Sequence, residues 1–121
     1  DVDHFKKIND SYGHQVGDSV LRRLADILQK DLQSPEMLFR MGGEEFILVS
    51  TKQTLEEVVR IAERLRDDIE TYQEADLPKF TVSMGITKYR LGETEVSLMT
   101  RADEALYQSK ANGRNCITTL A

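Results

Sequence analysis

Apolar residues in this 121-residue chain recur at helical spacing in two long stretches. From about residue 17 to residue 32 they return every three or four positions, which predicts a helix with one buried face. The same spacing runs from residue 55 to residue 72. Thr54 precedes this second stretch and Glu57 follows three positions later, which is the capping-box pattern of a helix start. The chain therefore contains two amphipathic helices.

The last third of the chain predicts a strand, a helix and another strand. Residues 80 to 86 alternate between apolar and polar, as in a strand with one buried face. A further helical stripe follows, and we expect Ser97 to cap its start and Gly113 to end it. The apolar run at residues 116 to 120 predicts a final strand. Cys116 falls in that run and is interpreted as a small core residue.

Two apolar runs, at residues 37–41 and 46–49, flank the sequence Gly42-Gly43-Glu44-Glu45. Paired glycines between such runs predict a tight hairpin, because glycine adopts the positive φ angles of primed turns. Neighbouring strand side chains point to opposite faces, so one of Glu44 and Glu45 should face a site and the other an edge or second contact. Taken alone, the motif favours an ordinary hairpin with two solvated glutamates.

The charge balance and the single cysteine narrow the function classes. Sixteen Lys and Arg residues against 21 Asp and Glu residues give a formal charge of −5, which argues against a nucleic-acid partner or direct contact with an anionic membrane. A nucleotide substrate stays compatible if a divalent cation offsets the charge. One cysteine excludes an internal disulfide, so we expect a cytoplasmic location. The length suits one domain, and neither a membrane span nor a signal peptide is visible.

Motifs on both sides of the glycine pair carry a family resemblance. The chain opens with Asp1-Val2-Asp3-His4-Phe5-Lys6-Lys7-Ile8-Asn9-Asp10, followed by Gly13-His14 and Gly17-Asp18. Near its end stand Ala102-Asp103, Ala105-Leu106-Tyr107 and Lys110-Ala111-Asn112-Gly113-Arg114-Asn115. In this order around Gly-Gly-Glu-Glu-Phe, these blocks closely resemble the GGDEF family of bacterial diguanylate cyclases over essentially the whole chain. The resemblance implies an enzyme that condenses two GTP into cyclic di-GMP and releases two pyrophosphates.

The resemblance also implies the fold. We expect an α+β fold, a ferredoxin-like palm similar to class III nucleotidyl cyclases, with helices packed on a mostly antiparallel sheet. In the family, a helix and a buried strand precede the residue that matches Asp1. Residues 1–121 are therefore expected to form a single catalytic domain that lacks this N-terminal helix and first strand and belongs to a longer protein. With that strand added, the order is β-α-β-β-α-β with an appended helix and strand.

Carboxylates are the centre of the implied chemistry. Forming a phosphodiester from a nucleoside triphosphate needs charge neutralisation and an activated hydroxyl, and carboxylate-bound Mg²⁺ supplies both. The resemblance implies that Asp1, Glu44 and the Val2 carbonyl bind Mg²⁺, with Mn²⁺ as an alternative ion. Glu45 matches an acid tied to metal binding or catalysis, and the choice between Glu44 and Glu45 as the base stays open. Asp3 is interpreted as structural or outer support.

Two basic segments are candidates for phosphate binding. A loop at Phe5-Lys6-Lys7 would offer exposed amides to an anion, with Lys6 matching the family's phosphate-contacting lysine and Lys7 solvated. Spacing alone assigns Lys110 and Arg114 to favourable electrostatics at a helix C-terminus. The resemblance implies that both contact the triphosphate.

Asn9 and Asp18 match the family's guanine-contacting residues. A carboxylate can accept from both the N1–H and the N2 amino group of guanine, whereas adenine presents an acceptor at N1. From the residues alone, Asn9 is also compatible with a turn and Asp18 with a helix N-terminus. His14 is interpreted as a structural histidine.

One segment departs from the family. Many members carry Arg-x-x-Asp upstream of the glycines as an inhibitory site for their product, and the matching positions here are Gln33 and Glu36. Gln33 lacks the guanidinium fork that clamps a phosphate or guanine. We expect weak or absent product inhibition, with Arg64 either a remaining secondary contact or a solvated helix residue.

The implied reaction needs two GTP-loaded domains, so a homodimer is expected, together with a fused sensory or regulatory domain. A catalytically inactive GTP-binding regulatory domain is the main alternative, and a domain that only dimerises is a second. Selective binding of GTP over ATP would distinguish a domain that only dimerises from the cyclase and from the regulatory domain.

Overall fold

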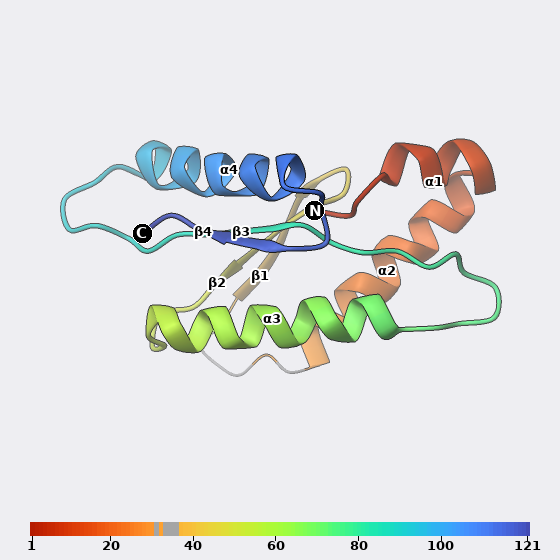
Figure 1. Cartoon of the computed structure of the whole chain (residues 1–121), viewed down its shortest axis with the longest axis horizontal. Helices are drawn as coiled ribbons and strands as arrows, with labels where there is room; N and C mark the ends of the chain where they lie inside the picture. Colours follow the sequence, from red (N-terminus) through yellow and green to blue (C-terminus); the bar gives the residue numbers. More distant parts are fainter. Residues whose placement is uncertain (31, 33–36) are drawn as a thin grey trace.

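The computed structural model describes residues 1–30, 32 and 37–121. Along the chain the elements are α1 (Phe5–Tyr12), α2 (His14–Lys30), β1 (Met37–Gly42), β2 (Glu45–Val49), α3 (Leu55–Thr71), β3 (Met84–Ile86), α4 (Glu95–Ala111) and β4 (Ile117–Thr119). Figure 1 shows β3 and β4 lying between α4 on one side and α3 on the other, with α1 and α2 grouped at one end. The predicted α+β arrangement is confirmed.

The described strands form two small sheets rather than one continuous sheet. β1 and β2 pair antiparallel, with Met37 opposite Val49, whereas β3 and β4 pair parallel through the α4 crossover. Residues 1 to 3 lie antiparallel beside the segment that leads into β3. The Ser83 N–H donates to the Asp1 carbonyl at 3.0 Å, and the Asp3 N–H donates to the Thr81 carbonyl at 2.9 Å. The start of the chain is thereby fixed against β3.

One hydrophobic core joins these elements. Its buried members come from the chain start, the first three helices and the β3 segment: Val2, Ile8, Val20, Leu21, Leu24, Leu28, Leu65, Ile69, Phe80 and Val82. The α2 and α3 residues in this set belong to the two apolar stripes that the sequence pattern predicted. Among the described residues, none of the helices is long and apolar enough to cross a bilayer.

Helix ends agree with the sequence pattern in part. The Thr54 side chain accepts from the Glu57 N–H at 3.2 Å, as predicted for the start of α3. The predicted cap of α4 was wrong by three residues, since Thr94 is the N-cap and accepts from the Ser97 N–H at 3.1 Å. Both residues carry hydroxyls suited to capping, but only Thr94 has the extended backbone that lies outside the helix. Gly113, with φ at 108°, follows the last turn of α4 as expected.

The α4 helix packs on β3 at van der Waals distance because β3 carries Gly85. A Cβ added there would lie 2.4 Å from the Leu106 nitrogen and 2.5 Å from the Ala102 carbonyl oxygen. The fully buried Ser109 hydroxyl also donates to the Met84 carbonyl at 2.7 Å. Helix α4 therefore has a fixed position over β3, and its C-terminal end has a fixed position relative to the chain start.

A nearly buried ion pair secures the other end of α4. The Arg101 guanidinium donates to both carboxylate oxygens of Glu93, at 2.7 and 2.8 Å, and to the Thr87 hydroxyl at 2.6 Å. The side chains of Arg101 and Glu93 are only 11% and 9% exposed. Hydrogen bonds from Arg101 lower the pKa of Glu93 to about 2. This contact joins α4 to the connection that follows β3.

Candidate active site

The predicted hairpin is confirmed, and its turn consists of Gly43 and Glu44. The strand register shifts after Arg40, so that Gly42 pairs with Glu45. The two turn residues are therefore Gly43 and Glu44 instead of Gly42 and Gly43. Gly42 and Gly43 have φ angles of 111° and 52°, a region that favours glycine. Glu44 is half-buried and Glu45 is exposed at the first position of β2. The two carboxylates therefore have different environments at the tip of one hairpin.

Arg40, which sequence reasoning missed, holds this turn. Its Nε and Nη2 atoms donate to the Gly43 carbonyl at 3.1 and 2.9 Å. A lone arginine in an apolar strand gave no sequence signal for this contact, because the turn shift that brings the Gly43 carbonyl within reach is a feature of the folded hairpin. Arg40 thus helps to fix the backbone that carries Glu44.

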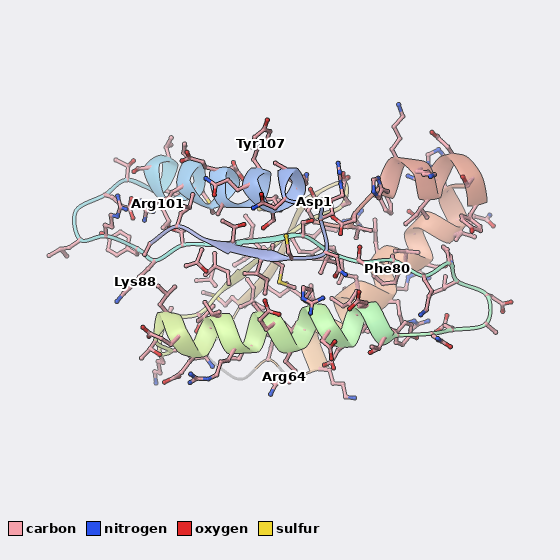
Figure 2. The ribbon with its side chains drawn as sticks, in the orientation of Figure 1. Asp1, Arg64, Phe80, Lys88, Arg101 and Tyr107 are labelled. Carbon is pink, nitrogen blue, oxygen red and sulfur yellow. The ribbon has the colours of Figure 1, made fainter. Side chains whose placement is uncertain are left out.

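The Asp1 side chain lies beside the end of α4 and is 3% exposed. Its Oδ2 atom forms an ion pair with the Lys110 ammonium, and its Oδ1 atom is buried without a hydrogen-bond partner among the described residues. Figure 2 shows Asp1 next to the C-terminal turns of α4. The carboxylate therefore keeps one unsatisfied oxygen in the interior of the candidate site.

The hairpin tip lies within electrostatic range of Asp1. The carboxylates of Asp3, Glu45 and Glu44 act electrostatically at the Asp1 nitrogen, in decreasing order of effect. The fold therefore brings together the two acidic segments, which are more than 40 positions apart in the sequence.

These residues fit a divalent cation that shares its coordination sphere with other oxygens. The unpartnered Oδ1 atom of Asp1 is a hard anionic ligand, the kind that Mg²⁺ prefers. The Asp1 carbonyl and the Asp3 N–H both bond to the segment before β3. Backbone groups of neighbouring residues in a strand point in opposite directions, so the Val2 carbonyl points away from that segment. Across the described parts of the chain, no three His, Cys, Asp or Glu side chains gather closely enough to hold a metal by themselves. A bound Mg²⁺ would therefore need water or substrate oxygens as well.

The predicted loop at Phe5-Lys6-Lys7 is instead the first turn of α1, so that prediction was wrong. The Ile8 N–H makes the first helical bond, to the His4 carbonyl at 3.1 Å. The amides of the three preceding residues therefore have no acceptor within the helix, which is the usual anion-binding property of a helix start. Lys6 and Lys7 are both exposed.

The two guanine candidates lie on neighbouring helices, Asn9 on α1 and Asp18 on α2. Asn9 is half-buried and packs against Gly17, whereas Asp18 is exposed. Asp18 lines a groove of about 480 Å³ between α2 and the β1–β2 hairpin. The groove is lined by Asp18, Leu21, Arg22, Ala25, Gln29, Leu38, Arg40 and Phe46.

The turn after α4 carries the second basic candidate. Arg114 has a left-handed backbone, with φ at 65°, and its N–H donates to the Ser109 carbonyl at 3.0 Å. Its side chain is exposed, whereas Lys110 reaches Asp1. Of the two cations that the sequence singled out, the fold brings only Lys110 into contact with an acidic candidate.

Asp3 is part of the structural support beneath the site, in agreement with its interpretation from sequence. Its buried carboxylate accepts from the Thr81 hydroxyl at 2.7 Å, the Ser83 hydroxyl at 2.5 Å and the Asn115 N–H at 2.9 Å. The Asn115 side chain in turn donates to Glu70 on α3 at 2.5 Å. Sequence reasoning did not single out Asn115 as the link between the α4 turn, α3 and the chain start.

The remaining residues singled out from the sequence are the product-inhibition positions, Arg64 and His14. Gln33 and Glu36 lie outside the described residues. Arg64 is exposed on α3 and points away from the β3–β4 sheet (Figure 2). His14 is exposed at the first position of α2, and no acidic candidate contacts it among the described hydrogen bonds and ion pairs. His14 is therefore in a helix rather than in the expected loop, and its structural role stays a prediction.

Helices packed on small sheets, with a hairpin that carries an acidic turn toward the chain start, define an α+β domain of the class III nucleotidyl cyclase type. The chain belongs to the GGDEF family. The family profile described as "Diguanylate cyclase, GGDEF domain" matches residues 1–116.

Individual relatives agree with this assignment. The chain is 41% identical over 115 residues to diguanylate cyclase DgcM of Escherichia coli K12, a match that covers 95% of this chain and 28% of DgcM. The chain thus spans less than a third of that relative. The GGDEF domain of DgcB from Caulobacter crescentus, solved in complex with c-di-GMP, superposes with a TM-score of 0.93 at 38% identity, covering 98% of this chain and 73% of that one. The active GGEEF domain of a Vibrio cholerae diguanylate cyclase gives 0.90 at 32% identity, covering 100% and 79%.

Proposed function

We propose that this domain is a Mg²⁺-dependent diguanylate cyclase that condenses two GTP into cyclic di-GMP and two pyrophosphates. The observation that carries the proposal is the buried Oδ1 atom of Asp1, which has no hydrogen-bond partner among the described residues. The Asp1 nitrogen also lies within electrostatic range of Glu44 and Glu45 in an intact Gly-Gly-Glu-Glu turn. A domain that only binds partners would gain nothing from an unsatisfied buried carboxylate oxygen, because such an atom is destabilising unless a ligand satisfies it. Similarity to named diguanylate cyclases supports the same reaction.

In this proposal the acidic residues hold the ion and the reacting hydroxyl. Asp1, Glu44 and the Val2 carbonyl would bind Mg²⁺, which neutralises phosphate charge and lowers the pKa of the attacking 3′-hydroxyl. Glu44 and Glu45 are the two candidates to accept the hydroxyl proton. The half-buried position of Glu44 suits metal binding, and the exposed position of Glu45 leaves it accessible to a second nucleotide.

The basic and amide groups would bind the triphosphate, and two polar side chains would select the base. The first-turn amides at Phe5 and Lys6 offer donors at the positive end of α1, and Lys110 and Arg114 add charge at the end of α4. Asp18 would accept from the N1–H and N2 amino group of guanine, with Asn9 as a second contact. Adenine presents an acceptor at N1, so this atom and the Asp18 carboxylate would repel each other.

Each domain would hold one GTP, so the reaction needs two domains facing each other. Each 3′-hydroxyl would then attack the α-phosphate bound by the opposite domain. Holding both nucleotides in this geometry removes a large part of the entropic barrier. Control of dimerisation would belong to segments beyond this domain, since the related DgcM is more than three times as long as the matched region.

The test is product analysis of the full-length protein incubated with Mg²⁺ and GTP, for the wild type and for Glu44→Gln. Cyclic di-GMP in the wild type, and none with Glu44→Gln or with EDTA, is the expected result. Glu56→Gln is the matched control, because Glu56 is an exposed acid on α3. GTP-selective binding without product would instead assign a regulatory GTP-binding role. Absence of nucleotide binding would leave only an interaction domain.

A further inference from the structure

The contact between α1 and α2 contains a space that an amide side chain fills. A Cβ built on Gly17 would lie 1.8 Å from the Asn9 Oδ1 atom and 2.9 Å from its Cγ atom. It would also lie 3.3 Å from the ring of Phe5. Contacts below 3.0 Å require one of the groups to move. The Asn9 amide therefore occupies the volume that any side chain at position 17 would need.

The oxygen of that amide faces the same contact. The Oδ1 atom of Asn9 is turned against Gly17, where it is buried and accepts no hydrogen bond from any described residue. The amide nitrogen points away from the oxygen in the plane of the group and is the polar atom left to face a ligand. A buried amide oxygen without a partner is uncommon in folded proteins. Close packing against Gly17, rather than a hydrogen bond, thus sets the position of the Asn9 amide.

We propose that Gly17 is a positioning residue for nucleotide selection, and that it acts only through Asn9. This inference rests on the proposed function, in which Asn9 and Asp18 contact the guanine base. Asp18 presents only acceptors, so an amide nitrogen held beside it adds the donor needed by an acceptor atom of the base. The missing Cβ of Gly17 keeps that donor in place. Any larger residue displaces the amide by more than 1 Å, since the nearest contact must lengthen from 1.8 Å to at least 3.0 Å.

Helix stability alone predicts the opposite effect of a substitution. Gly17 lies inside α2 (His14–Lys30), where alanine is intrinsically favoured over glycine. A loss of nucleotide affinity in Gly17→Ala would therefore come from the displaced amide and not from a weakened helix. The obstructing atoms belong to a side chain, which can rotate away, so the fold itself should survive.

The experiment is a double-mutant cycle on the full-length protein, measured by calorimetric binding of α,β-methylene-GTP in the presence of Mg²⁺. We expect Gly17→Ala and Asn9→Ala each to raise the Kd about tenfold, the scale of one lost hydrogen bond. In the Asn9→Ala background, Gly17→Ala should have no further effect. With GTP as substrate, Gly17→Ala should raise KM more than it lowers kcat. Gln15→Ala, an exposed α2 change, is the matched control.

Independent effects of the two substitutions, or wild-type affinity in Gly17→Ala, would overturn the inference. Asn9→Gln provides a second test that leaves Gly17 intact, because it keeps the amide but moves it by one methylene. Asn9→Gln should also weaken binding, and wild-type affinity in this variant would count against the proposal. If the wild type binds no α,β-methylene-GTP, the proposed function itself fails. If the wild type and Gly17→Ala bind equally, only this inference fails.

Discussion

The Asp3 carboxylate accepts a hydrogen bond from the Asn115 backbone N–H at 2.9 Å, although the two residues are 112 positions apart. The bond joins the chain start, which carries Asp1, to the turn after α4, which carries Arg114. Asn115 has a left-handed backbone, with φ at 47°, a region that asparagine adopts more readily than most residues. The Asp3 contact therefore fixes two segments of the candidate site relative to each other.

Replacing Asp3 by alanine should destabilise the fold. Three donors, the hydroxyls of Thr81 and Ser83 and the Asn115 N–H, would lose their buried acceptor. We expect a loss of about 2–4 kcal/mol in the free energy of unfolding, measured by urea denaturation. Asp10→Ala, at an exposed position of α1, is the control and should change stability by less than about 0.5 kcal/mol. An Asp3→Ala effect as small as the control would show that the buried acceptor contributes little.

Gly85→Ala should also destabilise the protein, for a steric reason. The added Cβ meets backbone atoms of α4 at Leu106 and Ala102, and a helix backbone cannot rotate away as a side chain can. We expect a loss of about 1–3 kcal/mol in the free energy of unfolding from the forced shift of α4. The comparison with Gly17→Ala is informative, because there the obstruction is the Asn9 side chain. Equal stability of Gly85→Ala and the wild type in urea would mean that α4 adjusts at no cost.

The ion pair between Arg101 and Glu93 predicts an acid-dependent loss of stability. The pKa of Glu93 is lowered to about 2 in the folded protein from an ordinary value of 4.5. A lowered folded pKa means that the contribution is complete above about pH 4.5 and is lost as the pH falls toward 2. Urea midpoints measured from pH 6 to pH 2.5 should therefore decline less steeply for Glu93→Gln than for the wild type. Parallel declines would rule out this ion pair as a source of the acid sensitivity.

Lys110→Met should weaken nucleotide binding while keeping the apolar stem of the side chain. The lysine ammonium lies against Asp1, at the position where the proposed triphosphate would meet the end of α4. Loss of a charged hydrogen bond should raise the KM for GTP about tenfold or more in steady-state assays. Lys79→Met removes an exposed lysine from the connection before β3 and is the matched control. A KM equal to that of the control would remove Lys110 from the substrate site.

The sequence was sufficient to predict those features, such as helix caps and tight turns, that depend on residues a few positions apart. The Thr54 side chain caps α3 by accepting from the Glu57 N–H three positions later, and Gly42 and Gly43 provide positive φ angles at the hairpin turn. The start of α4 was predicted three residues too late, because Thr94 and Ser97 both carry hydroxyls that can cap a helix and the residue types alone do not distinguish them. Helix α1 was missed as a helix at residues 5–7, although Phe5, Ile8 and Tyr12 have helical spacing, because a segment of only eight residues shows few repeats of that pattern.

The sequence by itself determined the family, the acidic hairpin and the amphipathic helices, because these depend on residue type and short spacing. Tertiary structure alone decided which groups meet: Asp1 with Lys110 and Asp3 with Asn115 across most of the chain, and Asn9 with Gly17 across two consecutive helices. Each of these contacts depends on how separate elements pack against each other. No local pattern encodes this packing, so the interior of the candidate site is a property of the packed fold.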